Sequence, residues 1–207
     1  FLLAEARQVV AFCRANAPAP IVLGGDGYSI FPESVLDQTG AEMGIQGEGE
    51  LAFALLLERL EAAAPLSDVP GLYLRERGLQ GPRSYIRDLD RFPLPEPGLF
   101  DSRLADDPDY YLPVQTRRGC PLNCSYCSTP AIEGALIRRR GAAAAVDFLR
   151  DWRDAGFAKI FFVDNTFNLP GAYANALCEE LIAAKLNITW RCILYPWKVG
   201  DKLVEKM

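Results

Sequence analysis

The sequence predicts an α/β protein made of two units. Three observations lead to this prediction: helical and strand patterns alternate along the 207 residues, half of the residues are apolar, and a proline-rich stretch separates two such alternations. Since one domain takes roughly 100–200 residues, the length fits one large or two small units. The prolines at residues 92–98 favour two, because proline neither continues a helix nor sits inside a sheet.

In the first unit, apolar residues at three- and four-residue spacing predict helices, and short apolar runs near glycine predict strands. The predicted helices span residues 2–15, 33–38 and 50–63, and the predicted strands span residues 21–23 and 43–45. The third helix is expected to bury a stripe formed by Phe53, Leu56, Leu57 and Leu60. Residues 71–75 and 83–86 are expected to be edge strands of a small appendage.

The second unit repeats a strand, a loop and a helix three times. The predicted strands span residues 111–116, 159–163 and 188–194, and the predicted helices span residues 142–155, 171–184 and 200–207. Because crossovers between parallel strands are right-handed, this order predicts a parallel array, open or barrel-like. A complete barrel takes roughly 250 residues, so this segment would be only its first part. The sequence thus divides into residues 1–68, an appendage with a linker at 69–109, and residues 110–207.

Composition excludes several classes of protein. The formal net charge is −5, from 22 basic and 27 acidic side chains, so binding to nucleic acid is not expected. The sequence has no signal-peptide pattern and no apolar run of the roughly 18 residues that a membrane span needs. Six Cys are too few for a secreted disulfide scaffold of this length, so a cytoplasmic, reducing location is expected. The first residue, Phe1, and the helical pattern at the other end are what a fragment would show.

Three cysteines lie within eight residues, directly after the first strand of the second unit: Cys120, Cys124 and Cys127. Parallel α/β sheets and barrels place their chemistry at this end of the strands. Three thiolates can hold three irons of a cubic iron–sulfur cluster, which leaves the fourth iron open for a substrate or cofactor. Structural zinc needs four closed ligands, but the chain has no His, and Cys178 and Cys192 fall on an apolar helix face and in a strand. The sequence therefore favours an iron–sulfur site over zinc.

The spacing Cys-x3-Cys-x2-Cys, with Gly119 before the first Cys and Tyr126 before the last, resembles the signature of the radical SAM superfamily. The resemblance covers residues 110–207. It implies that the three Cys hold a 4Fe–4S cluster whose open iron is chelated by the amino and carboxylate groups of S-adenosylmethionine. It also implies that reduction cleaves the sulfonium to a 5′-deoxyadenosyl radical, and that Tyr126 lies against the adenine.

Asp164, Asn165 and Thr166 follow the second strand, where the superfamily often carries a Gly-Gly-Glu motif that binds the methionine amino group. This sequence departs from that motif, but Asp164 and Thr166 offer a carboxylate and a hydroxyl that can accept hydrogen bonds from an ammonium group. By the resemblance, the three residues are expected to bind S-adenosylmethionine. Ordinary capping of the helix that begins near residue 171 explains the same residues equally well.

In the first unit, Gly24-Gly25 follows a strand, and the run from Gly47 to Glu50 precedes the leucine-rich helix. Glycines after a strand permit close approach to a ligand, although alone they also fit ordinary turns. In this order they are similar to the second half of the Rossmann-like cobalamin-binding domain that precedes many radical SAM cores. The resemblance implies that Gly24 and Gly25 lie beside the nucleotide tail of cobalamin. The family's Asp-x-His-x-x-Gly motif, whose His is the lower axial cobalt ligand, is expected upstream of Phe1.

Together, these resemblances imply the C-terminal half of a Rossmann-like cobalamin-binding domain, followed by the first part of a radical SAM partial (β/α) barrel. They imply a cobalamin-dependent enzyme that methylates an unactivated carbon of a small molecule, or rearranges or cyclises it. An electron donor such as flavodoxin or ferredoxin is the implied partner, and no membrane is involved.

Two alternative functions stay open. The first is a methylthiotransferase acting on tRNA or a ribosomal protein. Such an enzyme would need three further N-terminal Cys, of which the sequence offers only Cys13. The second is a non-catalytic iron–sulfur or zinc protein.

Overall fold

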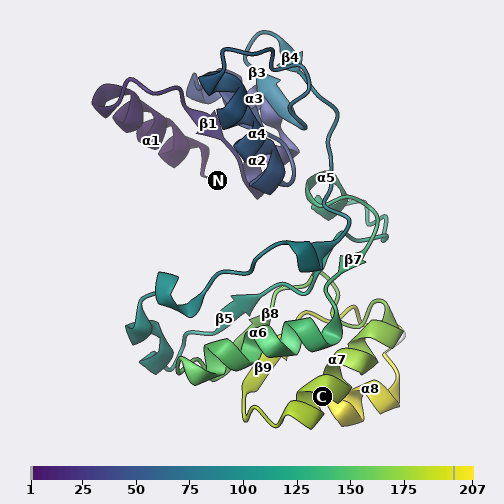
Figure 1. Ribbon diagram of the computed structural model, residues 1–207. Coiled ribbons are helices and arrows are strands. Elements are labelled where there is room, and N and C mark those ends of the chain that lie inside the picture. Colours follow the sequence, from purple (N-terminus) through teal and green to yellow (C-terminus); the bar gives the residue numbers. More distant parts are fainter. Residues whose placement is uncertain (1, 198) are drawn as a thin grey trace. The chain divides into compact units, whose positions relative to one another are not determined.

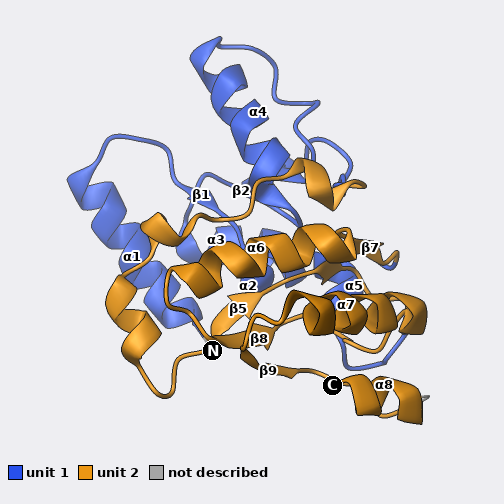
Figure 2. Ribbon diagram, turned by 60° about the horizontal axis from the view of Figure 1, so that its bottom comes forward, with its two compact units in different colours: residues 1–86, 122–135 blue, residues 87–121, 136–207 orange. Residues whose placement is uncertain are grey.

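The computed structural model describes residues 2–197 and 199–207, and it divides into two compact units (Figure 2). Unit 1 comprises residues 1–86 and 122–135, and unit 2 comprises residues 87–121 and 136–207. The boundary between the units therefore falls inside the cysteine-rich segment: Cys120 belongs to unit 2, and Cys124 and Cys127 belong to unit 1.

Unit 1 is built on a four-stranded mixed sheet in the order β1-β2-β3-β4 (Figure 1). Its strands are β1 (Val22–Leu23), β2 (Met43–Ile45), β3 (Leu72–Leu74) and β4 (Gly78–Leu79). Its helices are α1 (Leu3–Asn16), α2 (Asp26–Ile30), α3 (Pro32–Thr39), α4 (Gly49–Glu61) and α5 (Thr129–Ile132). Strands β1 and β2 are parallel, whereas β3 is antiparallel to both β2 and β4. Because β1 and β2 run in the same direction, the glycine turns that follow them leave the sheet at the same edge.

The predicted edge strand at residues 83–86 is wrong. The partner of β3 is β4 instead, because Glu76 and Gly78 adopt φ angles of +69° and +71° and turn the chain tightly between the two strands. The backbone of the 83–86 segment is held by other contacts, since the amide of Ile86 donates to the Glu48 carboxylate at 2.7 Å. Helix α2 and the short α5 are elements that the sequence pattern did not predict.

The predicted buried face of α4 is wrong in part. Leu56 is fully buried as expected, but Phe53 and Leu57 are exposed, and the small Ala52 is buried in their place. Ala52 and Leu56 are one turn apart, and both pack in the cluster that includes Ile45 of β2. The face of α4 that packs against the sheet is therefore narrower than the leucine content of the helix indicates.

The core of unit 1 consists of two apolar clusters. One contains Met43, Ile45, Ala52, Leu56, Val69 and Leu72, and the other contains Val10, Tyr28, Leu36 and Ala41. The ring of Tyr28 lies so close to the backbone of Gly44 that a Cβ at that position would overlap it. Burial raises the pKa of the Tyr28 hydroxyl well above its ordinary value. Gly44 is thus required by packing and not by its backbone conformation.

Unit 2 is built on a parallel three-stranded sheet in the order β5-β8-β9 (Figure 1). Its strands are β5 (Leu112–Val114), β8 (Lys159–Phe162) and β9 (Thr189–Cys192), and its helices are α6 (Ala142–Asp154), α7 (Gly171–Ala184) and α8 (Asp201–Lys206). An antiparallel ribbon that the sequence did not predict joins β6 (Arg117–Arg118) to β7 (Arg138–Arg139). The proline-rich linker holds three 3₁₀ turns, at Leu89–Arg91, Pro97–Leu99 and Ser102–Asp106.

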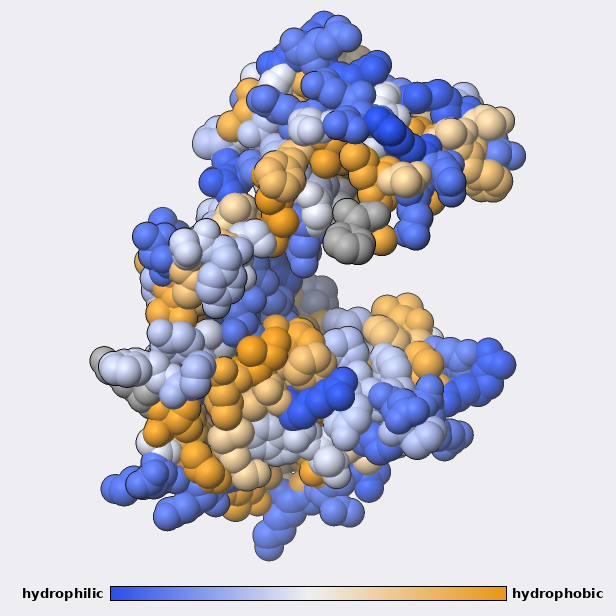
Figure 3. All heavy atoms as spheres, turned by 180° about the vertical axis from the view of Figure 1, so that it is seen from behind, coloured by the Kyte–Doolittle hydropathy of each residue, from blue (hydrophilic) through white to orange (hydrophobic). Residues whose placement is uncertain are grey.

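Helices α6 and α7 pack against one face of the unit 2 sheet. The buried residues of α6 are Ala145, Val146, Leu149 and Trp152, and those of α7 are Tyr173, Ala174, Leu177 and Cys178. Their spacing is that of one helix face. On the opposite face, the guanidinium of Arg191 lies 4.1 Å from the ring centroid of Tyr111 and 4.6 Å from that of Phe161. Figure 3 shows that apolar and hydrophilic residues are intermixed on the visible surface of unit 2. Among the described residues, no helix has both the length and the apolar character that crossing a membrane requires.

Candidate functional site

The three clustered cysteines lie on a loop between β6 and α5 that has no regular secondary structure. Gly119 turns the chain into this loop with a φ of +86°, a conformation that glycine adopts without strain. Cys120 is buried, Cys124 is half-buried and Cys127 is exposed. Within unit 1, the amide of Cys127 donates to the carbonyl of Cys124 at 3.1 Å. The loop thus presents thiols of differing accessibility to solvent.

The donor set of this loop fits an iron–sulfur cluster by its chemistry. All three thiols are free of disulfides, and thiolates are the ordinary protein ligands of such clusters. In the part of the chain that the structure describes, no three Cys, Asp or Glu side chains converge closely enough to hold a metal ion. The assignment of Cys120, Cys124 and Cys127 as ligands therefore stays a prediction based on residue type and spacing.

Tyr126 is the most exposed aromatic side chain of this loop, with 90% of its surface accessible. An aromatic ring that projects from a loop offers a flat apolar face on which a purine can stack. Its position next to Cys127 agrees with the expected contact to adenine, which stays a prediction.

The other cysteines of unit 2 behave as packing residues. Cys178 is buried in the core, and Cys192 is half-buried against it. Burial raises the pKa of the Cys178 thiol. Burial, together with the neighbouring Cys178, raises the pKa of Cys192 to about 11. Both side chains therefore stay protonated at neutral pH, which disfavours them as metal ligands.

Asp164, at the carboxyl end of β8, is the centre of a buried polar cluster. Its Oδ1 accepts hydrogen bonds from the amides of Thr116 and Arg117, at 2.7 and 2.9 Å. Its Oδ2 accepts from the Thr116 hydroxyl at 2.7 Å and from Nε and Nη2 of Arg117 at 3.1 and 2.8 Å. The remaining Arg117 nitrogen, Nη1, donates to the carbonyls of Phe167 and Leu169 at 2.6 and 2.9 Å. The side chains of Asp164 and Arg117 are 1% and 3% exposed, so the pair is buried, and each of its charged nitrogen and oxygen atoms makes at least one hydrogen bond.

This cluster gives Asp164 a structural role that the sequence did not indicate. Five hydrogen bonds already occupy its two oxygens, so a ligand ammonium group would have to displace Arg117 or Thr116. Asn165 and Thr166 are only half-buried. Of the three residues expected to bind S-adenosylmethionine, these two are the more exposed.

A second polar contact joins the loops that follow β8 and β9. Asn168 is buried, and its amide group donates to the carbonyl of Tyr195 at 2.8 Å and accepts from the Tyr195 amide at 2.9 Å. The amide of Phe167 donates to the carbonyl of Ile193 at 2.8 Å. The loops at the carboxyl ends of β5, β8 and β9 are therefore tied together by buried hydrogen bonds. Sequence reasoning missed Asn168, whose one signal is its place in the loop after a buried strand.

The first glycine turn of unit 1 leaves open space above its backbone, whereas a Cβ at Gly47 in the second turn would meet the Ile132 carbonyl at 3.5 Å and the Tyr85 ring at 3.9 Å. Gly25 and Gly47 have φ angles of +86° and +90°, so other residues would be strained at either position. A Cβ at Gly25 or Gly49 would meet no atom within 4 Å, and one at Gly24 would meet only the Ile45 carbonyl, at 4.0 Å. A bulky ligand can therefore approach the turn at Gly24 and Gly25 closely, as the tail of cobalamin would need to do.

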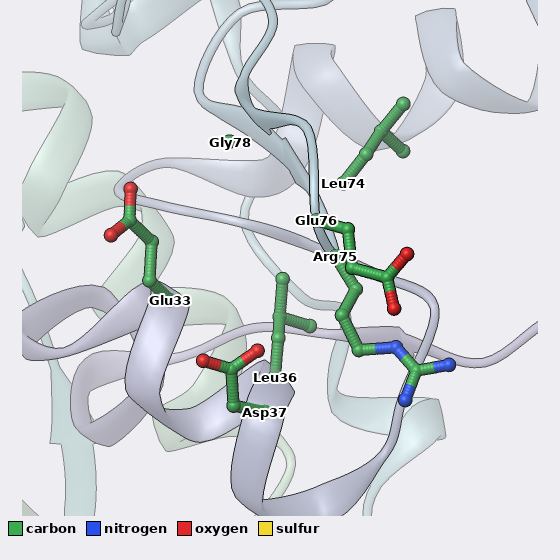
Figure 4. A pocket seen from close by; sticks show the side chains of 7 residues that line it. All are labelled: Glu33, Leu36, Asp37, Leu74, Arg75, Glu76 and Gly78. Atoms are coloured by element: carbon green, nitrogen blue, oxygen red, sulfur yellow. The ribbon is translucent and has the colours of Figure 1, made fainter.

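Unit 1 also contains a surface pocket of about 270 Å³ between α3 and the β3–β4 turn (Figure 4). It is lined by Glu33, Leu36, Asp37, Leu74, Arg75, Glu76 and Gly78. None of the residues predicted to bind a cofactor lines it. Both acidic and basic side chains surround it, as on an ordinary polar protein surface.

Comparison with known proteins gives relatives and solved structures, although no family model matches the chain. An uncharacterized methyltransferase of Pyrococcus horikoshii is 29% identical over 194 residues, which cover 90% of this chain and 42% of that protein. A provisionally named methylthiotransferase of Methanocaldococcus jannaschii is 28% identical over 238 residues, 98% of this chain and 50% of that protein. The chain thus spans about half the length of these relatives or less.

Two solved structures match nearly the whole chain. The radical S-adenosylmethionine methyltransferase TsrM from Kitasatospora setae, with tryptophan and an S-adenosylmethionine analogue bound, matches with a TM-score of 0.82 and 22% identity. The cobalamin-dependent radical enzyme OxsB, with aqua-cobalamin bound, matches with a TM-score of 0.73 and 20% identity. Each match covers 99% of this chain, but only 42% of TsrM and 31% of OxsB.

These matches confirm the predicted α/β fold class. The strand-and-helix order of unit 2 and the parallel β1–β2 pair of unit 1 are the elements that produce it. Over nearly its whole length, the chain has the fold of the matching parts of TsrM and OxsB.

Proposed function

We propose that the chain is part of a cobalamin-dependent radical SAM methyltransferase that acts on a carbon atom of a small molecule. The observation that carries this proposal is the Cys-x3-Cys-x2-Cys loop, which lies between β6 and α5 in a chain that has the fold of part of TsrM. When bound, a 4Fe–4S cluster supplies the electron that cleaves the sulfonium of S-adenosylmethionine, and cobalamin supplies a carrier for the methyl group. The substrate class is proposed by analogy with TsrM, whose structure holds tryptophan.

The residues of unit 2 and the cysteine loop would divide the work of binding. Cys120, Cys124 and Cys127 would hold three irons as thiolates, and Tyr126 would stack on the adenine. Asn165 and Thr166 would accept hydrogen bonds from the amino group of S-adenosylmethionine. The reaction also requires an external one-electron donor, for which a flavodoxin or ferredoxin in the cytoplasm is proposed.

Anaerobic reconstitution of the full-length protein with iron and sulfide tests the cluster assignment. We expect about four irons and four sulfides per chain for the cysteine loop, and an electron paramagnetic resonance spectrum of the reduced protein that changes when S-adenosylmethionine is added. Bound zinc without sulfide would instead support the zinc alternative.

The methylthiotransferase alternative is favoured by the Methanocaldococcus jannaschii relative. Against it, residues 1–110 hold only Cys13, which lies on α1, so this segment supplies no second three-cysteine set. About eight irons per chain after reconstitution would favour the methylthiotransferase over the methyltransferase.

For cobalamin, we expect that Gly24→Trp weakens binding at least about tenfold, because an indole would fill the space above the turn. Gly24 is a better test than Gly25, whose positive φ would add backbone strain to any substitution. Gly98→Trp is the matched control, since a Cβ at this linker position meets no atom within 4 Å and one at Gly24 meets only the Ile45 carbonyl, at 4.0 Å. The measurement is titration of the full-length protein with cobalamin, followed by visible absorbance. Equal affinities of Gly24→Trp and wild-type protein would contradict the placement of the tail.

A further inference from the structure

We infer that Ser29 is a positioning residue for cobalamin, because it braces the two glycine turns of unit 1 against each other. This inference rests on the proposed binding of cobalamin at these turns. Ser29 lies on α2, directly after the first glycine turn, and its side chain is completely buried. Its hydroxyl donates to the carbonyl of Gly25 at 2.8 Å and accepts from the amide of Gly47 at 3.0 Å.

The geometry of the sheet explains why such a brace is needed. In the parallel register, Val22 pairs with Met43 and Leu23 with Gly44, and the ladder ends there. Beyond that point, the segments that follow β1 and β2 form separate turns, and each turn contains a glycine with positive φ. The Ser29 hydroxyl connects the turns at the place where the ladder no longer does.

The backbone of Ser29 is held as well as its side chain. The side-chain amide of Gln46 donates to the Ser29 carbonyl at 2.7 Å. Gln46 lies between β2 and the second turn, and its own amide donates to the carbonyl of Gly71 at 2.9 Å. The Ser29 amide also donates to the Gly25 carbonyl, at 2.9 Å. Ser29 is thus fixed by four hydrogen bonds, and its hydroxyl has both its donor and an acceptor site satisfied.

The consequence for a ligand is preorganisation. A cobalamin tail that contacts both turns needs them at one fixed separation, and ordering them at the moment of binding would reduce the affinity. The Ser29 hydroxyl sets that separation in the free protein. It is buried, so it acts through the turns and does not touch the ligand.

Thr39 provides a matched control within the same unit. Its hydroxyl is also buried, donates to the carbonyl four residues earlier, that of Val35, at 2.7 Å, and accepts from the amide of Ala41 at 3.3 Å. Thr39 ends α3, before the amino end of β2, whereas the glycine turns follow the carboxyl ends of β1 and β2. Removal of either hydroxyl therefore deletes the same two kinds of hydrogen bond, but only Ser29 connects the turns.

The experiment compares Ser29→Ala with Thr39→Val in the full-length protein. Urea unfolding measures the loss of stability, and titration with cobalamin measures affinity. We expect comparable losses of stability in the two variants, a cobalamin affinity about tenfold weaker in Ser29→Ala, and an affinity within about twofold of wild type in Thr39→Val. If Ser29 had a purely structural role, two variants with equal losses of stability would not differ in cobalamin affinity.

Other outcomes overturn separate parts of the account. If wild-type protein does not bind cobalamin, the proposed function falls and this inference falls with it. If wild-type protein binds but Ser29→Ala binds equally well, or both variants lose affinity equally, the brace is overturned and cobalamin binding stands. If Ser29→Ala does not fold, Gln46→Met replaces it, because this change removes the amide that holds Ser29 and leaves the hydroxyl in place. Unchanged affinity in Gln46→Met would then count against the brace.

Discussion

Replacement of Cys120, Cys124 or Cys127 by Ser should abolish the iron–sulfur cluster of the full-length protein. A serine hydroxyl stays protonated at neutral pH and does not replace a thiolate on iron. The expected loss of activity exceeds the roughly 10–100-fold typical of residues that only support a metal ligand. Iron and sulfide content after anaerobic reconstitution, together with the absorbance of the cluster, measures the effect for each variant.

Two other cysteines of the same chain serve as controls. Cys13 is half-buried on α1, and Cys192 packs beside Cys178 with a pKa raised to about 11 by burial and by that thiol. Cys13→Ser and Cys192→Ala should both keep the full content of iron. Loss of iron in either control, or retention of iron when one of the clustered Cys is replaced, would contradict the proposed ligand set.

Substitution of Asp164 by Asn should cost about 3–5 kcal/mol of unfolding free energy, because it leaves the Arg117 guanidinium buried and without a counter-charge. The amide of Asn also turns a donor toward groups that themselves donate. Urea unfolding of the full-length protein measures the change. The control is Asp147→Asn in α6, since Asp147 and Arg150 form an exposed ion pair in which the loss should be less than about 1 kcal/mol.

A double variant separates the charge from the hydrogen bonds. Arg117→Met combined with Asp164→Asn removes both charges, so we expect its cost to be smaller than the sum of the two single costs by about 1 kcal/mol or more. The hydrogen bonds from Arg117 to the carbonyls of Phe167 and Leu169 are lost in this variant, so full recovery is not expected. Strict additivity of the single changes would show that the two side chains do not interact as a buried pair.

The elements of both units followed from local patterns. Periodicity located α6 and α7 and their buried faces, because each helix packs one apolar stripe against a sheet. The cysteine loop followed from residue type and spacing alone. The sequence does not predict β4, because the turn at Glu76 and Gly78 depends on two positive φ angles, for which Glu gives no signal.

The sequence does not predict the buried hydrogen bonds of Asp164 and Ser29, for a different reason. Asp164 and Arg117 are 47 residues apart, and Ser29 and Gly47 are 18 apart, so no periodic pattern links the partners. A buried ion pair and a bridging hydroxyl are made by the packing of the sheet, which the sequence does not display. The sequence pattern therefore indicates Asp164 as a ligand of S-adenosylmethionine, whereas in the structure its oxygens are occupied within unit 2.

The most direct test of the central claim is the cleavage of S-adenosylmethionine itself. The reconstituted full-length protein is incubated anaerobically with S-adenosylmethionine and a strong reductant, and 5′-deoxyadenosine is quantified by mass spectrometry. The account predicts that 5′-deoxyadenosine forms only when the reductant is present, and that Cys124→Ser forms none. Protein that holds four irons per chain and binds S-adenosylmethionine, yet forms no 5′-deoxyadenosine, would contradict it.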